Sequence, residues 1–275
     1  MKLSIVIVNW NSVNLIKECV DSILKTGSEQ ISSGEYELIV IDNGSTDAST
    51  EYLSALKEKI KFIKNNSNLG YAPACNQGMK AAQGQYVLLL GSDTIMLKDT
   101  LSKCADFLDA NPDAGAVGCR LLNADGTVQN SCKKFPTLKN AFFTYLSLDS
   151  FNSEYDMAWF AYDKTMEVDQ IATTFMMARK NLLEQIGYFD ESYKILYNDV
   201  DLCKRIKKSG AKIYFYHEAS VIHHGSHSTK KARYKLRRVM YGDIYRYYKK
   251  NFGFKAVFLY PILALRLLVV STIKA

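Results

Sequence analysis

Apolar residues in the first half of the chain occur in short continuous runs, separated by segments with helical periodicity. Continuous runs of four to six apolar or β-compatible residues are typical of strands buried on both faces of a parallel sheet. They predict strands at 3–8, 36–41, 60–64 and 86–90. Helices are predicted between them, from the cap residue Ser12 to about residue 24, then at 48–59 and 72–82. This alternation predicts an α/β fold with a mainly parallel central sheet flanked by helices.

The pattern changes after residue 113. A strand at 114–122, a tight turn at 123–126 and a returning strand within 127–135 are expected. The stretch 136–168 is irregular and rich in aromatic residues, which suggests a loop or short helices over a binding cleft. The remaining elements are strands at 171–179, 211–216 and 220–224, and helices at 180–186 and 199–209.

The last part of the chain has a different character. Aromatic residues recur there at helical spacing, interleaved with basic residues: Tyr234, Tyr241, Tyr245, Tyr248 and Phe252. This pattern is typical of a basic amphipathic helix lying in an anionic membrane interface. The apolar stretch 256–273 follows, but Pro261 and Arg266 interrupt it, so an interfacial, a spanning or re-entrant, and a packed or dimer-forming segment all stay open. We therefore divide the chain into a globular domain at 1–228 and a helical tail at 229–275.

The net charge of +7 is unevenly distributed. Residues 204–255 contain fifteen Lys or Arg against only Glu218 and Asp243, while the rest of the chain is net acidic. A basic segment of this kind fits nucleic acid, an anionic membrane or an anionic substrate. No zinc site, recognition-helix turn or ribonucleoprotein aromatic motif is present, so nucleic acid is not an expected partner.

The cysteines and the first residues bear on the cellular compartment. Six cysteines are scattered singly, which favours buried free thiols over disulfides or a zinc site. The apolar run at 3–8 is too short for a signal-peptide core, so a cytoplasmic protein is expected. No glycine-rich dinucleotide or phosphate loop follows the first strand, so a bound nucleotide would be held by side chains and a metal.

Two acidic positions carry the candidate chemistry. Asp93 follows the buried strand 86–90 at the carboxyl edge of the sheet, where open α/β folds bind ligands. It fits either a divalent cation that carries phosphate or an ordinary turn residue that caps a helix. Asp199 and Asp201 stand two apart on a predicted helix and point about 200° away from each other, so only one can face a substrate. Asp201 is placed to pair with Arg205 one turn later.

Several motifs, in order and in register, resemble the inverting family 2 glycosyltransferases of the GT-A fold, close to rhamnosyltransferase-like enzymes of bacterial surface polysaccharides. The resemblance spans residues 3 to about 228. The matching stretches are 5–11, 40–47, 68–72 with Asn76 and Gly78, 88–94, 125–126, 135–137, 187–191, 199–203 with Arg205, and 223–225 with Ser228.

This resemblance implies a donor site for a UDP- or dTDP-linked sugar. Asn9 and Trp10 would lie at the donor, with Trp10 packed against the base or simply in the core. Asp42 would accept the imide N–H of the base, or form an Asx-turn before the next helix. Gly70 would allow close approach of the backbone. Asn76 would bond the base or ribose, or be a polar residue of a helix face.

The resemblance also implies the metal and the base. Asp93 would bind Mg²⁺ or Mn²⁺, although Gly91 stands where an acidic residue is usual, and His223 either completes the shell or is a buried histidine. Asp199 would be the catalytic base, preceded by Asn198 in place of the usual Glu. The implied enzyme transfers sugar to a glycan or lipid-linked acceptor on the inner face of the cytoplasmic membrane. The alternative is a nucleotide-sugar-binding assembly protein without efficient transfer.

Overall fold

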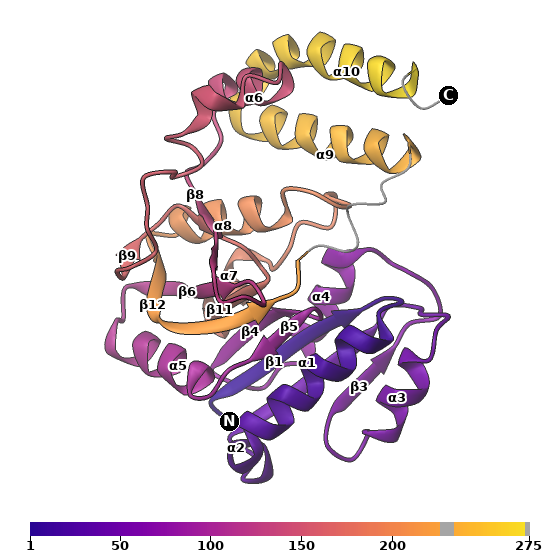
Figure 1. Ribbon diagram of the computed structural model, residues 1–275, viewed down its shortest axis with the longest axis vertical. Helices are drawn as coiled ribbons and strands as arrows, with labels where there is room; N and C mark the ends of the chain where they lie inside the picture. Colours follow the sequence, from indigo (N-terminus) through magenta and orange to yellow (C-terminus); the bar gives the residue numbers. More distant parts are fainter. Residues whose placement is uncertain (226–233, 273–275) are drawn as a thin grey trace.

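A mixed ten-stranded sheet forms the centre of the computed structural model, which describes residues 1–225 and 234–272 (Figure 1). Along the main path the strands lie in the order β3 (Lys61–Lys64), β2 (Tyr36–Asp42), β1 (Leu3–Asn9), β4 (Tyr86–Gly91), β11 (Phe175–Arg179), β6 (Ala114–Leu122), β12 (Lys212–His223) and β5 (Thr94–Met96).

The first half of the chain folds as the apolar runs predict. β1 pairs in parallel with both β2 and β4, and β3 continues this block beside β2. β11 is antiparallel to its neighbours β4 and β6, whereas β12 runs parallel to β6. The expectation of an α/β domain with a mainly parallel sheet is therefore confirmed.

Helices cover both faces of this sheet, because alternate residues of a strand point to opposite sides. Ile5 and Ile7 of β1 belong to one core cluster, together with Ile16 of α1 (Val13–Thr26). Val6 belongs to the other cluster, with Met79 of α4 (Tyr71–Ala81). All six cysteines are buried and free, as expected.

The helix starts and the second half of the domain show differences from the sequence expectations. Ser12 does not cap α1 with its side chain; instead the Val13 N–H donates to Asp47 Oδ2 at 3.0 Å, across the neighbouring loop. Helix α5 (Thr100–Ala110) was not assigned from the pattern. The two predicted strands after residue 210 are one strand, β12, with an irregularity between Tyr216 and Ser220.

The segment between β6 and β11 contains short elements joined by irregular stretches, as its composition suggests. The expected return is split into β7 (Val128–Gln129), which pairs with β6, and β8 (Cys132–Lys133), which pairs with β10 (Gln170–Ile171). The remaining minor elements are α2 (Ser28–Ser32), α3 (Ser49–Ala55), α6 (Leu138–Tyr145), η1 (Asp149–Asn152), β9 (Met166–Glu167), α7 (Lys180–Ile186) and α8 (Asn198–Lys208).

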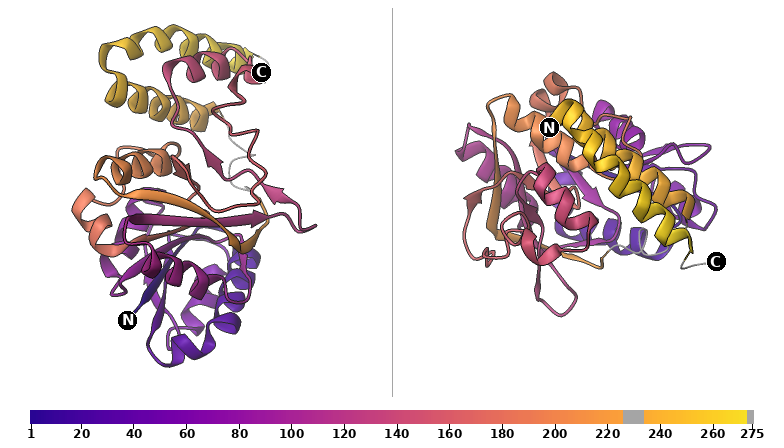
Figure 2. Two further views of the ribbon diagram at one scale, coloured as in Figure 1. Left: turned by 90° about the vertical axis from the view of Figure 1, so that its left-hand side faces the viewer. Right: turned by 90° about the horizontal axis from the view of Figure 1, so that it is seen from above.

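The tail consists of α9 (Tyr234–Phe252), η2 (Gly253–Leu259) and α10 (Tyr260–Thr272), which lie beside α6 at the end of the molecule opposite α2 (Figures 1 and 2). Tyr247 and Tyr248 of α9 are fully buried in a third core cluster that also contains Tyr193. The described tyrosines thus pack against the domain, which corrects the expectation that this stripe faces a membrane. Pro261 lies in the first turn of α10, where its missing N–H leaves no bond unmade.

Two expectations about the tail concern its limits. The proposed boundary between residues 228 and 229, and the motif residue Ser228, lie outside the described residues. Within the described residues, no helix combines the length and the apolar character needed to cross a bilayer.

Candidate active site

The loops after β1 and β2 are joined by a buried polar network. Asn9 Nδ2 donates to Asp42 Oδ1 at 3.0 Å, and the Ser12 hydroxyl donates to Asn9 Oδ1 at 2.7 Å. The other oxygen of Asp42 accepts bonds from the Thr50 hydroxyl at 2.8 Å and from the Ser45 N–H at 3.3 Å. Asn9 and Asp42 have no exposed surface. The buried side chains of Asn9 and Asp42 therefore hold the loops after β1 and β2 together, and a contact from either of them to a donor stays a prediction.

Trp10 and Gly70 lie at the surface of the same region. The Trp10 side chain is 52 % exposed, so the alternative of plain core packing is wrong and its ring is free to stack on a base. Gly70 has a φ of +93° and immediately precedes α4. A side chain there would strain the backbone, and its absence leaves room for a ligand at the helix start.

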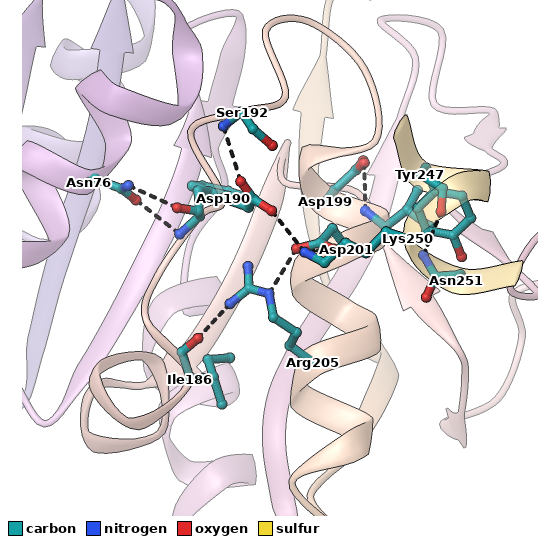
Figure 3. Close-up of polar contacts among 12 residues, drawn as sticks. Asn76, Ile186, Asp190, Ser192, Asp199, Asp201, Arg205, Tyr247, Lys250 and Asn251 are labelled. Carbon is teal, nitrogen blue, oxygen red and sulfur yellow. Dashed lines mark hydrogen bonds and ion pairs between the residues drawn. The ribbon is translucent and has the colours of Figure 1, made fainter. Parts of the chain in front are cut away.

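Asn76 holds two protein segments together. Its Nδ2 donates to the Phe189 carbonyl at 3.0 Å, and its Oδ1 accepts the Phe189 N–H at 3.0 Å (Figure 3). Its Nδ2 also donates to Glu191 Oε1 at 2.8 Å. Both amide hydrogens are thereby used, so the expected contact with the base or ribose stays a prediction and would have to use the second acceptor site of Oδ1. Asn76 fixes the loop that leads toward α8.

Asp93 and His223 meet at the carboxyl edge of the sheet. His223 Nε2 lies 3.4 Å from Asp93 Oδ2, and both side chains keep some exposure. Gln129 Oε1 lies 2.6 Å from His223 Nδ1 and orients the imidazole, as the outer partner of a metal-binding histidine does. An added Cβ at Gly91 would lie 2.8 Å from Asp93 Oδ1, so the usual acidic residue at position 91 would require the Asp93 carboxylate to shift.

These two side chains fit a divalent cation that takes its other ligands from elsewhere. A carboxylate oxygen and an imidazole nitrogen are both suitable donors for Mn²⁺, and the carboxylate also suits Mg²⁺. The described residues hold no group of three or more His, Cys, Asp or Glu side chains placed to bind an ion. Phosphate oxygens and waters would have to complete the shell.

Asp199 stands in the first turn of α8, with its Oδ1 accepting the Val200 N–H at 2.8 Å. Removal of its carboxylate from water raises the pKa of Asp199, and the Val200 N–H and the positive charge of Lys133 only partly counteract this. A raised pKa makes the carboxylate a stronger base near neutral pH.

A short path links Asp199 to the edge that carries Asp93. The Gly91 N–H, two residues before Asp93, donates to the Thr174 carbonyl at 3.0 Å. Thr173 and Asp199 both lie near Tyr71: burial raises the pKa of Tyr71, and the nearby charge of Asp199 raises it further. The segment 173–174 therefore contacts the end of β4 that precedes Asp93 and lies near the tyrosine that is close to Asp199.

Asp201 has a structural role, as its spacing predicts. Its Oδ2 accepts Arg205 Nε at 2.8 Å, and its Oδ1 accepts Lys250 Nζ of α9 at 2.7 Å (Figure 3). Lys250 also donates to Asp190 Oδ2 at 2.8 Å. Burial alone would raise the pKa of Asp190, but the bonds from Lys250 and from Ser192 outweigh burial and lower it to about 2.

Asp243 of α9 is a positioning residue for the loop before α8. In the sequence it shows only as one of two acidic residues in a basic segment. Its side chain is 1 % exposed and faces the loop that precedes α8. The carboxylate accepts the backbone N–H groups of Lys194, Ile195 and Leu196 at 2.7–3.1 Å. Helix α9 thereby fixes residues 194–196 of the loop that leads into α8, whose second residue is Asp199.

The family model described as glycosyl transferase family 2 matches residues 4–186, about two thirds of the chain. The chain belongs to this family. It is 25 % identical over 218 residues to an N-acetylglucosaminyl-diphospho-decaprenol L-rhamnosyltransferase of Mycobacterium tuberculosis, which covers 70 % of this chain and 67 % of that protein. It is 35 % identical over 139 residues to a poly(ribitol-phosphate) beta-glucosyltransferase of Bacillus spizizenii, covering 49 % of this chain and 22 % of that larger protein.

Solved structures show the same fold for this family 2 glycosyltransferase. Residues 1–349 of TarS from S. aureus, in complex with UDP-GlcNAc, match with a TM-score of 0.59 at 21 % identity, over 89 % of this chain and 66 % of that one. The mannosyltransferase PcManGT of Pyrobaculum calidifontis, solved with GDP-Man and Mn²⁺, matches with a TM-score of 0.61 at 17 % identity, over all of this chain and 76 % of that one. The fold is GT-A, and glycosyl transfer in polysaccharide synthesis is the activity that the family assignment supports.

Proposed function

We propose that this family 2 glycosyltransferase inverts configuration while it moves a sugar from a UDP- or dTDP-linked donor to a hydroxyl of a glycan or lipid-linked acceptor. The observation that carries the proposal is the Asp93–His223 pair at the carboxyl edge of the sheet, together with the buried carboxylate of Asp199 at the start of α8, whose pKa is raised by burial. A base and a site for the departing diphosphate are the two groups that a single in-line displacement needs.

Each residue has one task in this scheme. Asp199 accepts the proton of the attacking acceptor hydroxyl, and its raised pKa suits this. Asp93 and His223 would hold Mg²⁺ or Mn²⁺, which when bound neutralises charge on the departing diphosphate. The exposed ring of Trp10 stacks on the base, and any contact from Asp42 to the imide N–H would need the acceptor capacity left over from its three internal bonds.

The tail supports attachment to the inner face of an anionic membrane, where a lipid-linked acceptor would be presented. The described residues of η2 and α10 carry an exposed apolar surface made of Phe254, Val257, Phe258, Tyr260 and Leu265. Lys249 and Lys255 are exposed near it and would contact anionic head groups. Cosedimentation with anionic liposomes tests this: binding that weakens in Phe254→Ser/Phe258→Ser supports it, and a concentration-dependent dimer with no liposome binding assigns the surface to a second copy instead.

Nucleotide release from UDP- and dTDP-sugars, with and without Mn²⁺, tests the transferase proposal. Asp199→Asn should keep donor binding while transfer falls about a hundredfold or more. Asp93→Ala should lose about two to four orders of magnitude in turnover, because a ligand of the cation that would neutralise the diphosphate charge is removed. Asp163→Asn is a matched change of an exposed carboxylate, and it should leave turnover unchanged.

Two results would contradict the proposal. Full turnover in excess chelator, or in Asp93→Ala, would exclude a bound cation that assists the departure of the diphosphate. Donor binding by the native chain with no transfer to any of a panel of glycan acceptors, and no release of nucleotide, would favour the alternative of a nucleotide-sugar-binding assembly protein.

A further inference from the structure

A cavity of about 240 Å³ lies between α6, η1 and the start of α8. Four tyrosines contribute to its wall: Tyr145, Tyr155, Tyr197 and Tyr248. Its polar lining includes Lys133 and the carboxylates of Asp149 and Asp156. We propose that this cavity, hereafter the tyrosine pocket, binds one neutral pyranose ring of the acceptor. The inference rests on the proposed transferase function and adds the place and the class of its second substrate.

The tyrosine pocket lies next to the proposed base. Tyr197, one of its walls, is two residues before Asp199 on the same helix start. Lys133 lines the pocket and is close enough to Asp199 for its charge to lower the pKa of that carboxyl, against the larger effect of burial. The charge of Asp199 in turn contributes to the raised pKa of Tyr155, which burial mainly causes. A ring seated in the pocket would thus lie near the group that must take its proton.

The chemistry of the lining favours a sugar. Tyrosine rings present apolar faces that suit the C–H face of a pyranose, and their hydroxyls add polar edges. Carboxylates have only acceptor sites, so Asp149 and Asp156 suit the hydroxyl donors of a saccharide. Pockets that combine aromatic walls with a few fixed polar groups are the common form of small-molecule sites.

The charges of the lining disfavour an anionic ligand. Lys133 is the one basic side chain among the lining residues, and its Nζ is already paired with Asp156 Oδ1 at 2.6 Å. Asp149 adds a second carboxylate, so a phosphate or carboxylate ligand would meet like charge. The diphosphate of a donor, or of a lipid-linked acceptor, would therefore lie outside this pocket, and only the neutral ring would enter.

Helix α6 forms one side of the pocket, hereafter its roof, and α10 of the tail fixes it. Arg266 of α10 donates from Nη1 to the Thr144 carbonyl of α6 at 2.7 Å, and its guanidinium lies over the ring of Tyr145. The hydroxyls of Tyr145 and Tyr197 are 3.4 Å apart, which joins the roof to the start of α8. The pocket is thus built from elements that the protein holds in place without a ligand, as a pre-formed site requires.

Binding of a sugar panel to the full chain tests this assignment. The probes are the methyl glycosides of common hexoses, 6-deoxyhexoses and N-acetylhexosamines, observed by saturation-transfer NMR with the donor nucleotide present. At least one should bind, and Asp149→Asn and Tyr155→Ala should each weaken it about tenfold or more, because a bond to a charged group or an aromatic wall is lost. Asp163→Asn, a matched change of an exposed carboxylate outside the pocket, should change nothing.

The outcomes separate this inference from the proposed function. If no probe binds, or if binding is unchanged in both pocket variants, the pocket is not a sugar site. If probes bind as expected but the native chain releases no nucleotide from any donor, the transferase proposal fails while the sugar site stands. Because Tyr155→Ala can disturb folding, Asp149→Asn, an exposed position, and the unfolding temperature of each variant decide whether a loss of binding is local.

Discussion

Replacement of Asp243 by Ala should destabilise the protein by about 3–5 kcal/mol, the range seen when one partner of a buried ionic group is removed. The carboxylate accepts three backbone N–H groups, from Lys194, Ile195 and Leu196, at 2.7–3.1 Å. Each hydrogen bond to a charged acceptor contributes about 1.5–3 kcal/mol. The simple sum overestimates the loss, because Lys194 is exposed and water can replace part of what is lost.

Urea unfolding of the native chain and of three variants measures this effect. Asp243→Asn keeps the shape and one acceptor oxygen, so it should fall between the native chain and Asp243→Ala. Arg246→Gln is the matched control, because Arg246 pairs with the same carboxylate at 3.0 Å but is 43 % exposed, and such surface pairs contribute only about 0–1 kcal/mol. The rate of transfer by Asp243→Ala should also fall by a larger factor than its affinity for the donor, since the loop before Asp199 is no longer fixed.

Two results would refute the reasoning about Asp243. A loss below about 1 kcal/mol in Asp243→Ala would mean that the three N–H groups find other partners at little cost. Equal losses in Asp243→Ala and Arg246→Gln would mean that the ion pair, and not the backbone bonds, is what stabilises the loop.

Three further predictions concern the acidic residues around α8. Asp201→Asn should lower the urea midpoint without a selective loss of transfer, because it weakens the contacts to Arg205 and Lys250; a selective loss of transfer would move the base assignment by two residues. The pKa of Asp190 is lowered to about 2, so its stabilising effect is present above the ordinary Asp pKa of about 3.9 and is lost as pH falls toward 2. The urea midpoint of Lys250→Met should therefore change less over this pH range than the midpoint of the native chain. The pKa of Asp199 is raised, so its charged form destabilises the fold at pH values above the ordinary Asp pKa. Asp199→Asn should therefore melt at a higher temperature than the native chain at pH 7, while its transfer activity collapses. An unchanged or lower melting temperature would contradict burial as the cause of the raised pKa.

The sequence predicted those parts of the molecule that local patterns determine. The strands β1, β2 and β4 are continuous apolar runs, and such runs have few alternatives to a buried position in a sheet. The pair Asp201–Arg205 follows from a spacing of four residues on a helix. Positions at strand ends, such as Asp93, follow from the topology of an α/β sheet.

The sequence could not predict contacts made by residues far apart in the chain. Lys250 reaches Asp190 across sixty residues, and Asn76 reaches Phe189 across 113, so no local spacing records either contact. Asn76 carries a polar amide on a helix face, and that pattern fits a ligand contact and an internal bond equally well. Only the folded arrangement distinguishes them, because it shows which donors and acceptors are already paired.

The contacts of α9 with the domain indicate that the tail cannot be removed without damage to the fold. A chain ending at residue 228 would lack Tyr247 and Tyr248, exposing the core cluster that contains Tyr193. It would also lose Asp243, leaving the backbone N–H groups of residues 194–196 without their acceptor. We therefore expect this truncated chain to aggregate or to unfold at a lower urea concentration than any single variant above, and to lose donor binding with its fold. A truncated chain that bound donor with native affinity and unfolded at the native midpoint would show that α9 is only attached to the catalytic domain. Helix α9 fixes the loop before Asp199 and continues into η2, which carries the exposed apolar surface. The proposed attachment to a membrane at that surface and the position of the proposed base are therefore connected through one helix.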